Sequence, residues 1–301
     1  MSVVVVGSVA LDSITTPAGS VKEALGGSAT YFSLAASHFT SVKLVAVVGE
    51  DFPKKGLDLF KEHGVDTAGL ERKKGRTFRW EGVYSDNNLN IRETKLLELN
   101  VFAEFKPVLP TAYQDTPVVF LANIDPDLQQ DVLRQVKKPK MVACDTMNHW
   151  IANKHQGVVN LFKHVDAALM NDEEAKMLAK QDNLVLAARA ILKMGPKLVV
   201  IKKGEHGVLA MTPQWLFTVP GFPLEEVKDP TGAGDTFAGG LFGYLANEKN
   251  PWDAKAIRKG LLMGTVMASY CVQEFGVDRL AKLDERMIRL RYDTLLKLIT
   301  P

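Results

Sequence analysis

The sequence contains only two cysteines in 301 residues, Cys144 and Cys271, and both lie within apolar runs. So few cysteines exclude a disulfide-stabilised scaffold and fit a reducing compartment, so we expect a cytoplasmic protein. No window holds 18 uninterrupted apolar residues, and we therefore expect no membrane span. The apolar start, MSVVVVG, has no basic segment before it, and we interpret it as a buried strand rather than a signal peptide.

The sequence also lacks a charge excess and the common metal or nucleotide motifs. Its formal net charge of +2 gives no reason to expect nucleic acid or an acidic membrane as a partner. The six histidines show no HExxH spacing and the cysteines no CxxC spacing, which argues against a zinc site. No GxxxxGK[ST] occurs, and no GxGxxG follows the first apolar run, so neither a P-loop nor a nicotinamide site is supported.

Short runs rich in β-branched residues do recur along the chain, with amphipathic helical patterns between them. Such uniformly apolar runs are typical of strands that are covered on both faces. Their alternation with helices predicts an α/β fold with a parallel sheet and right-handed crossovers. The runs are 3–7, 43–49, 117–124, 140–145, 166–171 and 197–204.

Two segments depart from this alternation. Residues 75–99 alternate polar and apolar side chains around a turn at 86–88, which predicts an antiparallel hairpin. Residues 12–25 are also extended and polar. We infer a small β lid from 12–26 and 75–99 over a core of 1–11, 27–74 and 100–301; a surface hairpin without a role is the alternative.

The most informative stretch is DPTGAGDTFAGG, residues 229–240, where a helical pattern begins. Glycines at a helix N-terminus allow a ligand close to unpaired N–H groups, which suits an oxyanion or phosphate. Asp235 would repel a phosphate, but it could instead take a proton from an attacking hydroxyl. The alternative is that Asp235 only caps the helix and the glycines only allow tight packing.

This stretch resembles the signature D-x-T-G-A-G-D-x-F of the ribokinase-like (PfkB) carbohydrate kinases. Other segments match that family in order and spacing, and the resemblance covers almost the whole chain. They are GSVALD (7–12), GGSATYFSLAAS (26–37), VAVVGEDFPKKG (45–56), FKEHGVDT (60–67), NDEE (171–174) and KKGEHG (202–207).

The resemblance implies a three-layer α/β/α core with a mostly parallel central sheet and a small β lid. It implies ATP-dependent phosphorylation of a hydroxymethyl group, with Mg²⁺ as a cofactor. Asp235 would be the general base, and Gly232, Ala233 and Gly234 would form the anion hole. An ordinary aspartate pKa of about 3.9 would leave Asp235 ionised at neutral pH, so this role requires no raised pKa.

The same resemblance assigns residues to the acceptor. Asp12 would accept hydrogen bonds from two sugar hydroxyls. Gly26 and Gly27 would let the sugar lie against the backbone. Without the resemblance, Asp12 reads as a turn residue and the two glycines as a turn before a helix.

Further residues are assigned to the nucleotide and to ions. Asn171 and Glu174 would organise Mg²⁺ and phosphate, with Glu174 acting through water, although N-x-x-E is also a capping box. The nucleotide would also contact Gly204, Gly207 and Thr231. Asp229 would bind a monovalent cation such as K⁺, as in some members. Lys202 and Lys203 would reach phosphate, unless they are simply solvated.

The acceptor is less clear from the sequence. Phe78, Trp80 and Tyr84 share one face of the predicted hairpin and could stack on a nucleobase, whereas the nearby Arg79 and Arg92 could bind a phosphorylated sugar. Packing between the lids of a homodimer would explain the aromatic face equally well. The segment DTMNHWI (145–151) lacks the arginine of the D-x-N-x-R form common in ribokinases.

We therefore expect a small unphosphorylated sugar as the acceptor, and a nucleoside such as adenosine as the alternative. A nucleotide-binding regulator without turnover is a third hypothesis, which the intact Asp235 disfavours.

Overall fold

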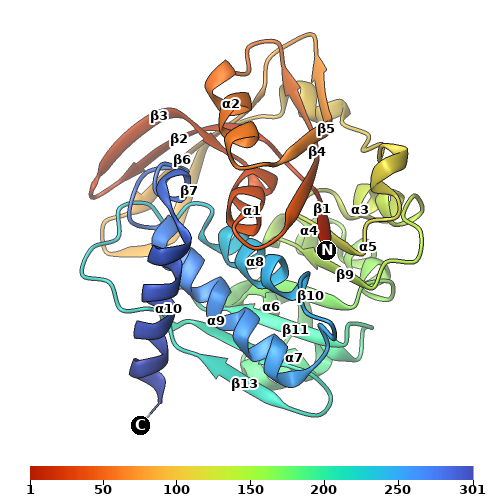
Figure 1. Cartoon of the computed structure of the whole chain (residues 1–301), viewed down its shortest axis with the longest axis vertical. Coiled ribbons are helices and arrows are strands. Elements are labelled where there is room, and N and C mark those ends of the chain that lie inside the picture. The colour runs from red at the N-terminus through yellow and green to blue at the C-terminus, as the bar shows by residue number, and fades with distance from the viewer. Residues whose placement is uncertain (301) are drawn as a thin grey trace.

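A computed structural model describes residues 1–300 and contains two sheets. The larger sheet has nine strands in the order β13-β12-β11-β10-β9-β8-β1-β4-β5 (Figure 1). Its strands are β1 (Ser2–Val6), β4 (Ser41–Gly49), β5 (Asp66–Lys73), β8 (Val118–Leu121), β9 (Met141–Asp145), β10 (Ala167–Asn171), β11 (Leu198–Lys202), β12 (Val208–Met211) and β13 (Leu216–Val219).

The strands from β11 to β5 are all parallel, and the antiparallel β12 and β13 extend one edge. Each apolar run named above overlaps one of the parallel strands. The strands β5, β12 and β13 lack a long apolar run and were not predicted from the sequence. The predicted fold class, a mostly parallel sheet within an α/β/α core, is confirmed.

Helices cover both faces of the large sheet. Along β1, Val3 and Val5 belong to a core shared with α1 and α8, while Val4 and Val6 belong to a second core on the opposite face. The first layer contains α1 (Ser28–Ser37), α8 (Ala233–Leu245), α9 (Ala254–Cys271) and α10 (Glu285–Ile299). The second contains α3 (Pro126–Leu133), α4 (Asn148–Asn153), α5 (His155–Phe162), α6 (Asp172–Ala179) and α7 (Leu184–Leu192).

The short helix α2 (Lys54–Glu62) lies against β5, and four 3₁₀ turns complete the described chain: η1 (Asn100–Glu104), η2 (Thr111–Tyr113), η3 (Gly204–His206) and η4 (Leu280–Lys282). None of the helices in residues 1–300 is both long and apolar enough to cross a membrane.

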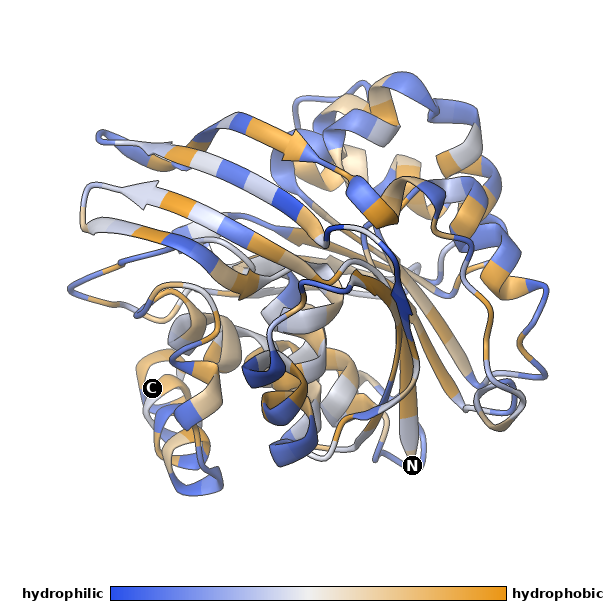
Figure 2. Ribbon diagram, turned by 90° about the horizontal axis from the view of Figure 1, so that it is seen from above, coloured by the Kyte–Doolittle hydropathy of each residue, from blue (hydrophilic) through white to orange (hydrophobic). Residues whose placement is uncertain are grey.

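The second sheet, called the small sheet below, has four strands in the order β3-β2-β6-β7. They are β2 (Ala10–Thr16), β3 (Gly19–Gly26), β6 (Phe78–Ser85) and β7 (Asn88–Glu98), so two hairpins distant in sequence join through parallel pairing of β2 with β6. Figure 2 shows hydrophobic central strands in the large sheet and mixed residues in the small one. The division of the chain into core and lid stays a prediction.

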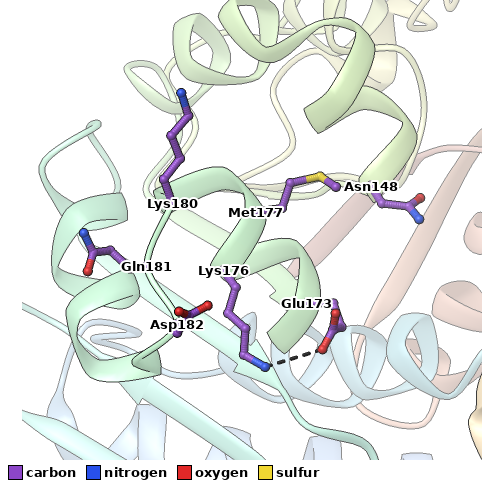
Figure 3. Close-up of a pocket in the computed structure, with 7 residues that line it drawn as sticks. All are labelled: Asn148, Glu173, Lys176, Met177, Lys180, Gln181 and Asp182. Atoms are coloured by element: carbon purple, nitrogen blue, oxygen red, sulfur yellow. Dashed lines mark hydrogen bonds and ion pairs between the residues drawn. The ribbon is translucent and has the colours of Figure 1, made fainter.

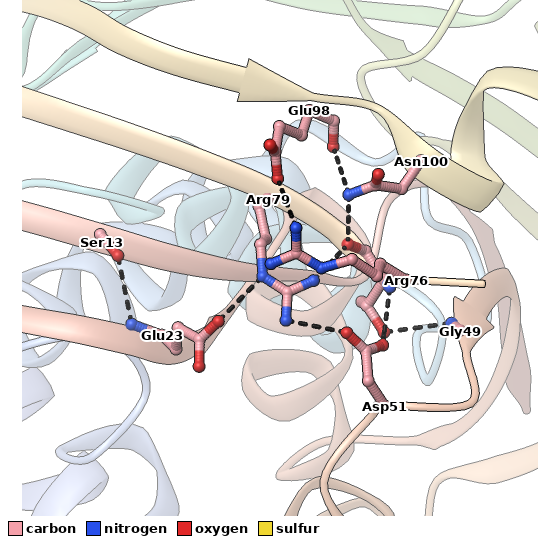
Figure 4. A network of polar contacts seen from close by, with 9 residues as sticks. Ser13, Glu23, Gly49, Asp51, Arg76, Arg79, Glu98 and Asn100 are labelled. Carbon is pink, nitrogen blue, oxygen red and sulfur yellow. Dashed lines mark hydrogen bonds and ion pairs between the residues drawn. The ribbon is translucent and has the colours of Figure 1, made fainter.

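A polar network joins the small sheet to the core (Figure 4). Arg79 on β6 forms ion pairs of 2.8 Å with Glu23 on β3 and with Asp51, which follows β4. The other oxygen of Asp51 accepts hydrogen bonds from the N–H and the hydroxyl of Thr77, both 2.7 Å. Arg79 therefore fixes where the small sheet leaves the core and is not available to a ligand.

Candidate active site

The start of α8 has the geometry expected of an anion site. Gly232 is the N-cap residue with φ +73°, and a Cβ there would lie 2.4 Å from the ring of Tyr31, so only glycine fits. Within residues 1–300, the N–H groups of Gly232 and Gly234 donate to no acceptor on another residue. Two backbone donors are thus free beside Ala233 at the positive end of a helix of 13 residues.

Lys202 reaches these donors from the end of β11. Its ammonium lies 3.0 Å from the position that a Cβ on Gly234 would occupy, and it pairs with the buried carboxylate of Asp145 at 2.5 Å. Burial disfavours the ammonium charge, but Asp145, Glu174 and Asp235 outweigh it and raise the pKa of Lys202. A permanent cation therefore lies next to the free N–H groups, and Lys202 is not a solvated surface lysine.

Asp235 is half-buried and lies in the first turn of α8. Burial, and then the Asp145 carboxylate, raise its pKa to about 7, while Lys202 and Arg92 act in the opposite direction. The role of a general base requires only an ionised carboxylate, and the structure raises the pKa of Asp235 beyond what that role needs. The physical reason is that residues distant in sequence desolvate this carboxylate and place a second one beside it.

Asn171 and Glu174 form a complete capping box at the start of α6. The Glu174 N–H donates to Asn171 Oδ1 and the Asn171 N–H donates to Glu174 Oε2, both at 2.8 Å. Glu174 Oε1 has no hydrogen bond within the described chain, and burial raises the pKa of Glu174 to about 7. A buried carboxylate with one free oxygen, facing Lys202, fits a role in holding a hydrated Mg²⁺.

Asp12 lies on β2, with its carboxylate against Gly26. A Cβ on Gly26 would be 1.9 Å from Asp12 Oδ2, so this glycine makes room for Asp12 rather than for a ligand. Gly27 has φ +92°, and a Cβ there would lie 2.5 Å from the Ser8 carbonyl oxygen, so the backbone itself requires glycine. Burial raises the pKa of Asp12 to about 7, and the negative charges of Asp229 and Asp235 add to the shift.

Asp229 is buried and shapes the turn before α8. Its two oxygens accept hydrogen bonds from Thr231 N–H (2.8 Å) and Gly276 N–H (2.9 Å), and burial raises its pKa. Asp229 forms no ion pair within residues 1–300, and the nearby Tyr31 hydroxyl is buried without a partner. A buried carboxylate that no protein cation neutralises fits a monovalent cation site.

The small sheet contacts the core site at two points. The Tyr84 hydroxyl on β6 forms a hydrogen bond of 2.9 Å with the Thr231 hydroxyl. Asn90 on β7 donates to Glu205 at 2.8 Å, and its amide fills the space beside Gly204, where a Cβ would lie 2.4 Å from Asn90 Oδ1. Gly204 and Gly207 have φ of +55° and +80°, as a tight turn after β11 requires.

The structure thus brings Asp12, Glu174, Lys202, Asp229 and Asp235 together around the start of α8. Lys203 is partly buried, and its backbone N–H closes the 203–207 turn. Tyr84 and Arg92, which the sequence suggested only as alternative contacts of the acceptor, also lie at the site, together with Tyr31 and Asp145. The sequence offered a weak signal for Asp145, at a strand end, and none for Tyr31.

A surface hollow lies on α6 beside this site (Figure 3). Glu173 and Lys176 form an ion pair of 3.4 Å at its edge. It contains none of the predicted site residues. The lining residues are Asn148, Glu173, Lys176, Met177, Lys180, Gln181 and Asp182.

Comparison with known proteins bears on the family and the fold of this chain. Residues 1–282 match the pfkB family of carbohydrate kinases. A cytidine kinase from Thermococcus kodakarensis is 30% identical over 81% of this chain and 88% of its own length.

Among solved structures, a Burkholderia thailandensis nucleoside kinase in complex with inosine matches with a TM-score of 0.81 and 18% identity, covering 98% of both chains. A Vibrio cholerae fructokinase double mutant bound to fructose, ADP and potassium matches with a TM-score of 0.78 and 18% identity, covering 97% of this chain and 98% of the fructokinase. At that identity the two structures show the shared fold.

Solved structures of this fold hold ADP with potassium, in the Vibrio cholerae fructokinase, or ATP with Mg²⁺, in a putative ribokinase II from E. coli, which supports ATP and a metal ion in general. The chain belongs to the pfkB family of carbohydrate kinases, as an ATP-dependent kinase that acts on a hydroxyl group of a sugar or nucleoside.

Proposed function

We propose that this kinase phosphorylates a nucleoside, with Asp235 as the general base and the start of α8 as the phosphoryl site. The observation that carries the catalytic part is the grouping of the free Gly232 and Gly234 N–H groups, the Lys202 ammonium and the Asp235 carboxylate. Backbone donors and a cation suit a phosphoryl group, and a carboxylate beside them suits the hydroxyl that attacks it.

In the proposed reaction, the acceptor oxygen forms a bond to the γ-phosphorus of ATP while the bond to the ADP oxygen breaks. The hydroxyl proton moves to Asp235, and ADP leaves with the bonding electrons. Asp235 must be ionised to accept that proton, and its pKa of about 7 makes it a stronger base than an ordinary aspartate. Bound Mg²⁺ would neutralise phosphate charge, with Glu174 holding it through water, and K⁺ at Asp229 is part of the proposal.

The remaining roles follow from position. Gly204, Gly207 and Thr231 would lie along the nucleotide, with Asn171 holding the start of α6 in place. Asp12 would bind two hydroxyls of the acceptor ribose, which Gly26 permits by leaving space for its carboxylate.

The small sheet is proposed to act as a lid whose inner face meets the acceptor. Trp80 pairs with Asp12 across β6 and β2, so the two side chains share that face. Its indole lies over Gly82, donates to the Thr94 hydroxyl at 3.2 Å and has the Arg92 guanidinium 5.7 Å from its ring centroid, so a planar base would stack on Trp80 only if Arg92 moved off the ring. Phe78 instead stacks on Phe102, and Tyr84 is buried against Thr231.

The sequence alone placed a sugar ahead of a nucleoside. The cytidine kinase relative, whose similarity extends over most of both chains, together with Trp80, favours the reverse order. A small sugar remains the second candidate, because Asp12 can bind the vicinal hydroxyls of either acceptor.

A homodimer formed through the lid is a further proposal. Ile91, Leu96 and Leu97 on β7 are 59%, 41% and 57% exposed. Apolar side chains along an exposed edge strand are the kind of surface that a second copy would cover. Sedimentation of the wild type against Ile91→Lys tests it, and a wild type that stays monomeric contradicts it.

The acceptor is tested by measuring ADP release from MgATP with cytidine, adenosine, inosine, ribose and fructose. We expect the highest kcat/KM for a nucleoside, and a larger loss of that value in Trp80→Ala for nucleosides than for free sugars. Faster turnover of a free sugar would contradict the nucleoside assignment. Tight ATP binding without turnover of any acceptor would favour the regulator hypothesis.

A further inference from the structure

Strand β7 of the small sheet brings an arginine to the active site that no motif assigns. Arg92 and Thr94 alternate along β7 and so share a face, and Asn90 precedes them at the register shift near the turn of the hairpin. Asn90 contacts Glu205 and Gly204 of the core, and Arg92 pairs directly with Tyr84, whose hydroxyl reaches Thr231. Arg92 therefore lies between two contacts that dock the small sheet on the active site.

The guanidinium of Arg92 has no anionic partner. Within residues 1–300, Arg92 forms no ion pair, whereas Arg76, just before β6, pairs with Glu98, and Arg79 on β6 pairs with Glu23 and Asp51 (Figure 4). The Arg92 side chain is exposed and lies over the Trp80 ring, 5.7 Å from its centroid. An exposed cation–π contact contributes only about 0.5–1 kcal/mol, so packing alone is a weak reason for an arginine here.

The charges around Arg92 come from both halves of the site. Its positive charge lowers the pKa of Asp12 in the acceptor region, and of Glu174 and Asp235 in the phosphoryl region, against the stronger effect of burial. The Tyr84 hydroxyl also faces it. A positive charge that is felt by carboxylates of both regions lies near the boundary between the acceptor region and the phosphoryl region. The phosphoryl group crosses this boundary during transfer.

We propose that Arg92 is a catalytic residue supplied by the lid, whose guanidinium binds the phosphoryl group during transfer from the side opposite the core cation Lys202. Two N–H groups of a guanidinium match the oxygens of a phosphoryl group, on which negative charge is spread in the transition state. Lys202 is fixed in the core by Asp145, but Arg92 is present only when β7 is docked. The cation set is then complete only with the lid closed, which protects ATP from hydrolysis when no acceptor is bound.

This inference rests on the kinase activity and not on which acceptor is used. The test compares Arg92→Gln and Arg92→Lys with the matched control Lys95→Gln, which removes one exposed positive charge from the same strand. Each variant is assayed for kcat with the acceptor that the wild type uses, for binding of MgATP, and for binding of MgADP with aluminium fluoride, a mimic of the phosphoryl group in flight.

We expect Arg92→Gln to lower kcat by about 10²–10³-fold, the loss typical of one transition-state donor. Its affinity for MgADP–aluminium fluoride should fall, while MgATP affinity and the unfolding midpoint stay near wild type. Arg92→Lys should recover part of kcat, and Lys95→Gln should change none of these quantities.

An Arg92→Gln enzyme with wild-type kcat, including one in which only the acceptor KM rises, would overturn the proposal. If the wild type turned over no acceptor, the proposed function would fail, but the fluoroaluminate measurement would still decide the role of Arg92. In that case, an affinity of Arg92→Gln for MgADP with aluminium fluoride that equals the wild-type affinity would overturn the proposed role of Arg92.

Discussion

Replacing Gly26 by alanine should displace Asp12 without disturbing the backbone. Gly26 does not have a left-handed φ, so alanine can adopt its conformation. The new Cβ would lie 1.9 Å from Asp12 Oδ2, whereas an ordinary contact begins at 3.4 Å, so the carboxylate must retreat by about 1.5 Å (3.4 − 1.9). A hydrogen bond to a charged group is worth about 1.5–3 kcal/mol, which corresponds to roughly 10–10²-fold in acceptor affinity.

The assay is steady-state kinetics with the acceptor varied at saturating MgATP, and then the reverse. For Gly26→Ala we expect the acceptor KM to rise by about 10–10²-fold while the KM for ATP stays unchanged. Gly157→Ala on α5 is the control, because its Cβ would lie 3.3 Å from Pro126 and 3.7 Å from Asp127 and Lys154, none of which belongs to the site. A Gly26→Ala enzyme with a wild-type acceptor KM would refute the placement of Asp12 at the acceptor.

Two further predictions concern pH. Burial raises the pKa of Asp12 and Asp235 to about 7, and both carboxylates must be ionised to act. The value of kcat/KM should therefore rise with pH and level off above about 7. A profile of kcat/KM that stays flat down to about pH 5 would contradict this prediction. Burial also lowers the pKa of His38 from 6.5 to about 4. Neutral His38 therefore stabilises the fold above pH 6.5, and this contribution is lost as the pH falls toward 4. If an NMR titration of the folded protein showed the His38 ring titrating near pH 6.5, this stability contribution of neutral His38 would be excluded.

The core of the fold could be predicted from sequence because its signals are local. The valine run at 3–6 is apolar at every position, since one face of β1 packs on α1 and the other on the layer of α3 to α7. The glycines of 232–234 and Asp235 likewise follow one another in the chain, so their meeting at a helix start needed no tertiary information. Strands such as β12 and β13 were missed because they are short and rely on pairing.

The rest of the site depends on contacts between distant segments. The pairing of Lys202 with Asp145 joins residues 57 positions apart, and the Tyr84–Thr231 hydrogen bond joins residues 147 apart. The raised pKa of Asp235 follows from such contacts, which is why an ordinary value seemed sufficient from the sequence. The role of Gly26 also changed once the position of its missing Cβ was found to be filled by the Asp12 carboxylate.

The most direct test of the account is single-turnover phosphoryl transfer by Asp235→Asn at saturating MgATP and acceptor. The asparagine matches the aspartate in shape but cannot accept the hydroxyl proton, so the account predicts a rate lower by about 10²–10⁴-fold, with MgATP affinity preserved. A transfer rate close to that of the wild type would contradict the assignment of Asp235 as the base.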